Sequence, residues 1–171
     1  MAISNEPWVL VDDLRCRDPA AVEPSIAYLE ADPWAFRTGY VKARLLRHLR
    51  KHDLDRAQRD RLGIVLLRTV DVGYRGEYAE ACRLARHVDL PDVRDGLVAR
   101  LHGADAPTAL RALQMLLATD AELTDADLAR ARAVVVQAAA SRRRPPAWLP
   151  RTFSPLWYPA WTDALRAQRD T

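Results

Sequence analysis

Apolar residues recur along most of the chain at the spacing of one helix face. Leu62 and Leu66 form one such group, and Leu110, Leu113 and Leu117 form another. Residues three or four apart lie on the same side of an α-helix, whereas a half-buried strand alternates apolar and polar residues, and no segment alternates convincingly. The pattern therefore predicts an all-α protein in which Leu66 and Leu113 are buried.

Helix starts are marked by capping side chains, early prolines and acidic first turns, which satisfy free N–H groups and complement the helix dipole. These signals stand at Asp18-Pro19, Asp32-Pro33, Asp53 with Leu54-Asp55, Leu90-Pro91-Asp92 and Thr124-Asp125. Together with the apolar spacing they predict helices near residues 19–31, 35–51, 55–71, 76–88, 91–102, 105–119 and 124–141.

Parts of the chain repeat one another at intervals in the mid-thirties. Residues 44–49 read Arg-Leu-Leu-Arg-His-Leu, residues 83–88 read Arg-Leu-Ala-Arg-His-Val, and residues 111–116 match them more loosely. Gly63 and Gly96 occupy matching places in two of the predicted first helices. A glycine inside a helix costs about 1 kcal/mol relative to alanine, so the matched pair indicates close packing of neighbouring helices.

This pattern resembles the HEAT-like class of α-solenoids over roughly residues 19–141. The resemblance implies a short α-solenoid of about three to four stacked antiparallel helix pairs, closed by N- and C-terminal caps, with the second helices lining a concave surface. It brings no catalytic residue set. An ordinary helical bundle remains the alternative, while the Trp, Gly-Tyr and Pro positions usual in tetratricopeptide arrays are absent.

The two ends of the chain are expected to cap the repeats, because a solenoid must cover its terminal apolar faces. Residues 1–18 contain the short apolar run Trp8–Val11, and residues 142–171 form a tail rich in proline and tryptophan. We expect the tail to pack on residues 19–141. The alternative is an aromatic anchor for a partner, formed by Trp157 and Trp161, since tryptophan dominates many interfaces.

Composition is that of an ordinary folded domain: 49% of the 171 residues are hydrophobic and 29% are charged. The chain has neither a long apolar span nor the pattern of a signal peptide, so we expect a cytoplasmic protein without a membrane partner. Cys16 and Cys82 lack the spacing of a zinc site, and four scattered histidines add no third ligand. We therefore expect no metal and no cofactor.

Positive charge is concentrated on the predicted second helices. Arg37, Arg44 and Lys51 repeat every seven residues and form a basic stripe along one helix. Stacked in register, the repeats align Arg44, Arg83 and Arg111 in one row and Arg47 and Arg86 in a second. Such rows could bind an acidic peptide or a nucleic-acid backbone. The alternatives are that the rows are an ordinary solvated helix face, and that the high arginine content reflects a GC-rich genome.

Two functional hypotheses follow. The first is a non-catalytic adaptor or scaffold module that binds a protein partner through the arginine-lined face or the aromatic tail. The second is a nucleic-acid-binding protein, whose enzymatic extreme is a HEAT-like DNA-repair glycosylase. The chain contains no Gly-rich phosphate loop, no GxSxG motif and no Cys/His nucleophile pattern, so the sequence favours the first.

Overall fold

The computed structural model describes residues 7–33, 38–73, 75–141, 146–149 and 151–167. Of these described residues 78% are helical, and they contain no strand. The helices are α1 (Pro7–Arg15), the 3-10 turn η1 (Pro19–Ala21), α2 (Val22–Ala31), α3 (Thr38–Leu49), α4 (Arg56–Val72), α5 (Tyr78–Val88), α6 (Pro91–His102), α7 (Ala106–Ala118), α8 (Asp125–Ser141) and α9 (Ser154–Ala167). The all-α prediction is confirmed.

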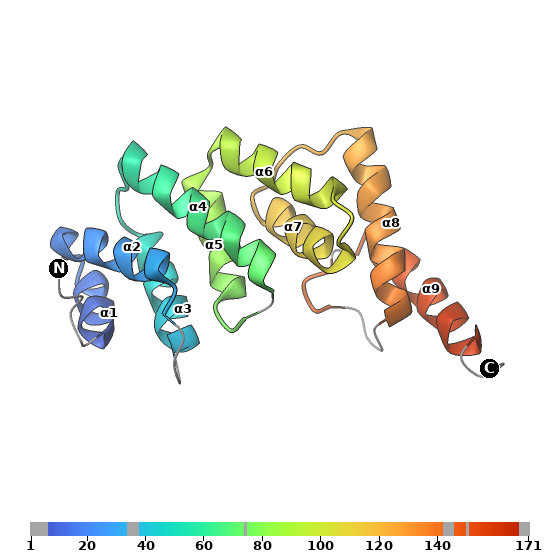
Figure 1. Ribbon diagram of the computed structural model, residues 1–171, viewed down its shortest axis with the longest axis horizontal. Helices are drawn as coiled ribbons and strands as arrows, with labels where there is room; N and C mark the ends of the chain where they lie inside the picture. The colour runs from blue at the N-terminus through green and yellow to red at the C-terminus, as the bar shows by residue number, and fades with distance from the viewer. Residues whose placement is uncertain (1–6, 34–37, 74, 142–145, 150, 168–171) are drawn as a thin grey trace.

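The helices form two rows that run along an elongated molecule. Helices α2, α4, α6 and α8 contact one another in succession, and so do α1, α3, α5 and α7. Pairs such as α4 with α5 and α6 with α7 join the rows, while α1 and α9 lie at opposite ends (Figure 1). This packing is compatible with a helical repeat. Within the described part of the chain, no helix is both long and apolar enough to cross a membrane.

The predicted caps form for local reasons. Asp55 caps α4 in a reciprocal capping box with Gln58, and Thr124 and Asp127 bond each other's backbone at the start of α8. Asp32 is different, because it does not begin the next helix. It ends α2 in the left-handed conformation, where its carboxylate pairs with Lys42 and Arg75.

Leu66 and Leu113 are fully buried, as predicted. The paired glycines also lie where α4 and α6 approach closely. A Cβ atom on Gly63 would lie 2.6 Å from Val93 of α6, and one on Gly96 would lie 2.8 Å from Leu67 of α4. Each glycine thus admits a side chain of the opposite helix, which accounts for the matched pair in the sequence.

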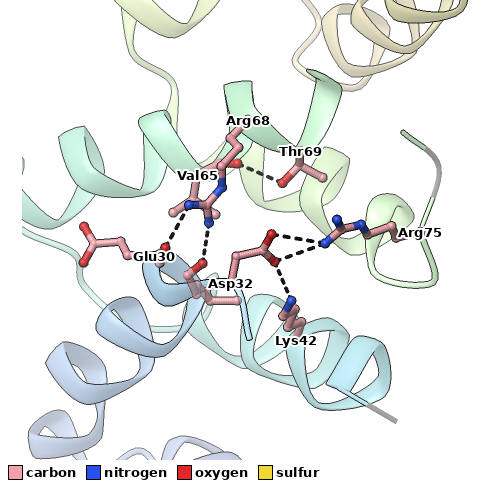
Figure 2. A network of polar contacts seen from close by, with 8 residues as sticks. Glu30, Asp32, Lys42, Val65, Arg68, Thr69 and Arg75 are labelled. Atoms are coloured by element: carbon pink, nitrogen blue, oxygen red, sulfur yellow. Dashed lines mark hydrogen bonds and ion pairs between the residues drawn. The ribbon is translucent and has the colours of Figure 1, made fainter. Parts of the chain in front are cut away.

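Arginines on one helix bind the C-terminal carbonyls of its neighbour at several steps of the array. Figure 2 shows Arg68 of α4, which donates to the carbonyl oxygens of Leu29 and Glu30 at 2.6 and 2.8 Å. Arg130 of α8 donates in the same way to Leu101 and Gly103 at the end of α6. The last carbonyls of a helix lack partners within it, so each arginine satisfies groups that would otherwise be unpaired.

The same region holds a buried ion pair that joins α2 to α3. Lys42 is only 3% exposed, and its ammonium group donates to Asp32, which Arg75 also contacts at 3.2 Å (Figure 2). Burial alone would raise the pKa of Asp32. The Lys42 hydrogen bond and the charges of Lys42, Arg75 and Arg68 outweigh burial and hold this pKa below its usual value.

Candidate binding surface on helices α3 and α5

Four of the arginines singled out in the sequence gather on one exposed face. Arg44 and Arg47 lie on α3, and Arg83 and Arg86 lie on α5, which packs against α3. Tyr40 stands four residues before Arg44 on the same side of α3 and is 73% exposed. We call Tyr40, Arg44, Arg47, Arg83 and Arg86 the α3–α5 arginine surface. Arg37, also predicted to belong here, lies outside the described residues.

A buried carboxylate joins the two predicted arginine rows. Glu80 of α5 is 4% exposed, and its Oε1 accepts hydrogen bonds from Arg47 Nε at 3.1 Å and Nη2 at 2.7 Å. The same oxygen accepts a bond from Arg83 Nη1 at 2.6 Å. One negative charge therefore orients two guanidinium groups, whose side chains stay about half exposed to solvent (48% and 56%). The pair keeps a surplus positive charge and unused N–H donors.

The electrostatics of the surface favour an ionised Glu80. Burial alone would raise its pKa, but the Arg47 hydrogen bond and the charges of Arg83, Arg47 and Arg50 lower it below the usual value. His48 lies beneath the same face. Burial, followed by the charges of Lys51, Arg47, Arg44 and Arg15, lowers the pKa of its imidazole. Cations that disfavour one more positive charge at His48 create a potential that attracts anions.

The remaining two arginines differ in their pairing. Arg86 contacts Asp120 at 2.5 Å in an exposed ion pair, whose side chains are more than half accessible. Such pairs contribute little to stability, so Arg86 can exchange this partner for a ligand at small cost. Arg44 is exposed and makes no ion pair with another described residue. Arg44 therefore breaks no ion pair with a described residue when it binds a ligand.

Arg111 does not belong to the exposed row, contrary to the sequence-based alignment with Arg44 and Arg83. It is 7% exposed, and its Nε donates to the carbonyl oxygen of Val70 at 2.6 Å. Its guanidinium also contacts Thr108 and the Asp71 carbonyl. The end of α4 offers unpaired carbonyls at this point, so Arg111 is drawn inward as a structural donor. The exposed part of the predicted arginine rows therefore ends at α5.

The aromatic tail packs on the domain, and Trp157 is fully buried. Trp161 is partly buried and packs against the same core. Helix α9 lies along α8, where the large indole of Trp157 gains more from burial than from solvent exposure. Trp157 therefore does not form the exposed aromatic anchor that was the alternative to packing on the domain.

Sequence reasoning missed one member of this surface, Tyr40, and the buried Glu80 that supports it. Tyr40 continues the stripe of Arg44 and Arg47 at helical spacing, and an i, i+4, i+7 count would have found it. Glu80 is the one acidic residue of α5, three residues before Arg83, which hints at an ion pair within the helix. Its contact with Arg47 has no sequence signal, because the two residues stand 33 positions apart on different helices.

Two histidines bind backbone carbonyls, whereas His102 Nε2 contacts the Asp127 carboxylate at 2.8 Å. His52 Nε2 donates to the Leu14 carbonyl at 3.0 Å, and His87 Nε2 donates to the His52 carbonyl at 3.2 Å. Searching the described residues reveals no group of three His, Cys, Asp or Glu side chains placed to hold a metal ion. The guanidinium groups of the α3–α5 arginine surface offer ionic and hydrogen-bonded contacts to a ligand.

Comparison with models of known families, with curated proteins and with solved structures gave no match.

Proposed function

We propose that the chain is a non-catalytic, HEAT-like interaction module that binds an acidic segment of a partner protein through the α3–α5 arginine surface. The observation that supports this most is the shared Glu80 oxygen, which fixes Arg47 and Arg83 beside each other. Donors that are oriented before binding lose less conformational entropy when a ligand arrives. Arginine and tyrosine are also the residue types enriched among interface hot spots.

The HEAT-like class is part of the proposal and rests on repeated contacts rather than on sequence alone. Arg68 of α4 and Arg130 of α8 each bind the C-terminal carbonyls of the preceding helix in their row, and Gly63 and Gly96 make reciprocal close contacts between α4 and α6. Recurrence of one device at two steps of a row is expected of stacked units that contact only their neighbours.

The extent of the basic surface favours a short acidic peptide over nucleic acid. Duplex binding draws its affinity from many phosphate contacts along a backbone, which requires a long cationic track. Here the exposed arginines of the two predicted rows are confined to α3 and α5, since Arg111 is buried. Glu80 and Asp120 further neutralise part of the charge.

A charge-reversal pair tests this proposal. We expect Arg44→Glu with Arg86→Glu to weaken binding of a labelled oligoglutamate peptide at least about tenfold, a loss of roughly 1.4 kcal/mol, because both side chains face solvent on the proposed surface. The thermal midpoint should move little, since neither residue is anchored to the core. Fluorescence anisotropy measures binding, and circular dichroism at rising temperature measures folding.

The matched control is Arg56→Glu with Arg132→Glu on the other helix row. This pair also combines one arginine in an exposed ion pair, Arg56 with Asp60, and one without an ion pair among the described residues. It changes the net charge equally and should leave binding intact. If both double variants lose binding equally, the effect comes from the overall charge of the protein and not from the α3–α5 arginine surface. Tighter binding of a short DNA duplex, lost steeply with salt, would favour the nucleic-acid hypothesis instead.

A further inference from the structure

A separate cleft lies where the end of α1 meets the turn between α3 and α4. Its volume is about 280 Å³, and its wall includes Arg17, Val22, Lys51, His52 and Asp53. The cleft is large enough for a compact metabolite, though smaller than most drug-sized pockets. It lies outside the α3–α5 arginine surface, and the inference below does not rest on the proposed function.

Arg17 occupies a backbone position that favours glycine. Its φ angle is 66°, and the bonds from Arg17 N to Leu14 O and from Asp18 N to Asp13 O end α1 in a Schellman motif. The other non-glycine residues with positive φ in the described chain are Asp32, Asp89 and Asp120. Aspartate tolerates this conformation because its short side chain bonds locally, whereas arginine has no such compensation. The structure thus places a long cationic side chain at the cleft despite a backbone cost.

The two cations of the cleft are available to a ligand. Neither Arg17 nor Lys51 makes an ion pair with another described residue. The His52 ring, by contrast, is engaged by the Leu14 carbonyl and forms part of the wall rather than a ligand-binding group. Asp53 adds one carboxylate, which can accept hydrogen bonds from a ligand's hydroxyl groups.

We propose that this cleft binds a compact phosphate monoester. Its phosphate lies between the Arg17 guanidinium and the Lys51 ammonium, both suited to phosphate oxygens, and a hydroxyl group of the ligand faces Asp53. The ester can be a free metabolite or a phosphorylated side chain of a partner, because both present the same group. Pro19 and Val22 supply an apolar wall beside the ester carbon atoms.

Replacement of Arg17 by glycine separates binding from folding. Arg17→Gly removes the guanidinium yet relieves the left-handed backbone, so the thermal midpoint should stay at or above that of the unmodified protein. Binding of glycerol 3-phosphate and of inorganic phosphate, measured by calorimetry, should weaken at least about tenfold, or roughly 1.4 kcal/mol. Lys51→Gln should do the same.

Two controls complete the test. Arg15→Gln removes the same charge two residues away but leaves the cleft wall unchanged, so phosphate binding should persist. Asp53→Asn should lower the preference for glycerol 3-phosphate over inorganic phosphate. Tighter binding of a phosphoserine peptide than of glycerol 3-phosphate would identify the natural ligand as a phosphorylated side chain of a partner. Failure of all three probes to bind, or unchanged binding by Arg17→Gly, overturns the proposal, whatever the oligoglutamate result.

Discussion

At the scale of single residues, the two cysteines have opposite environments. Burial raises the pKa of the Cys82 thiol to about 12, although a hydrogen bond with Tyr78 and the charge of Arg83 act in the other direction. Cys16 is exposed at the end of α1. The thiolate is the reactive form, so Cys82 combines a very small thiolate fraction with poor access.

We therefore expect one rapidly reacting thiol in the folded protein. A chromogenic disulfide reagent at mildly alkaline pH should modify Cys16 quickly, and Cys82 only as the protein unfolds. The variant Cys16→Ser should lose the rapid phase entirely. Rapid modification of two thiols per molecule of the unmodified protein would show that Cys82 is not buried as described.

At the scale of helices, the contact between α4 and α6 depends on two glycines, and the two positions differ in how well they tolerate an added methyl group. The Val93 methyl that faces Gly63 belongs to a stiff β-branched side chain, whereas the Leu67 methyls that face Gly96 lie at the end of a longer one. An added methyl group displaces the leucine end more easily than the valine.

We expect Gly63→Ala to destabilise the protein by up to about 2 kcal/mol, because an overpacking cost of about 1–3 kcal/mol outweighs the roughly 1 kcal/mol that alanine gains in helix propensity. Gly96→Ala should be closer to neutral, since Leu67 can rotate away. Urea unfolding of the two variants measures the difference. A stabilised Gly63→Ala protein would mean that α4 and α6 lie further apart.

At the scale of the whole molecule, carboxylates paired with arginine or lysine connect helices that are distant in sequence. The pKa of Glu30 is lowered chiefly by its hydrogen bond from Arg61, and those of Asp32 and Glu80 are lowered by their partners against the effect of burial. A carboxylate whose pKa is lower in the folded state stabilises the fold above its unfolded-state pKa.

This contribution should be lost as the pH falls. The loss begins near the usual pKa values, 4.5 for glutamate and 3.8 for aspartate, and is complete below the lower pKa values of the folded state. Urea midpoints between about pH 7 and about pH 3 should therefore decline steeply at the acidic end. Glu80→Gln should be less stable at neutral pH but lose less on acidification, because its side chain no longer titrates. An unchanged slope in this variant would contradict the role assigned to Glu80.

Apolar spacing and capping signals in the sequence predicted seven helices that correspond to α2–α8, whereas α1 and α9 lie in the segments expected to cap the repeats. These signals act over one or two turns of a single helix, so Thr124 before α8 and Pro91 at the start of α6 could be identified without knowledge of the neighbouring helices. The matched glycines also indicated a close helix contact, because glycine inside a helix is costly without such a reason.

The role of each charged or aromatic residue, by contrast, depends on contacts between distant parts of the fold. Arg83 and Arg111 occupy similar sequence patterns, yet one faces solvent and the other bonds Val70, which lies 41 residues earlier. Glu80 meets Arg47 across 33 residues, and Trp157 is buried where α9 meets α8. Burial and ion pairing depend on which distant groups come into contact, and local propensity carries no information about those contacts.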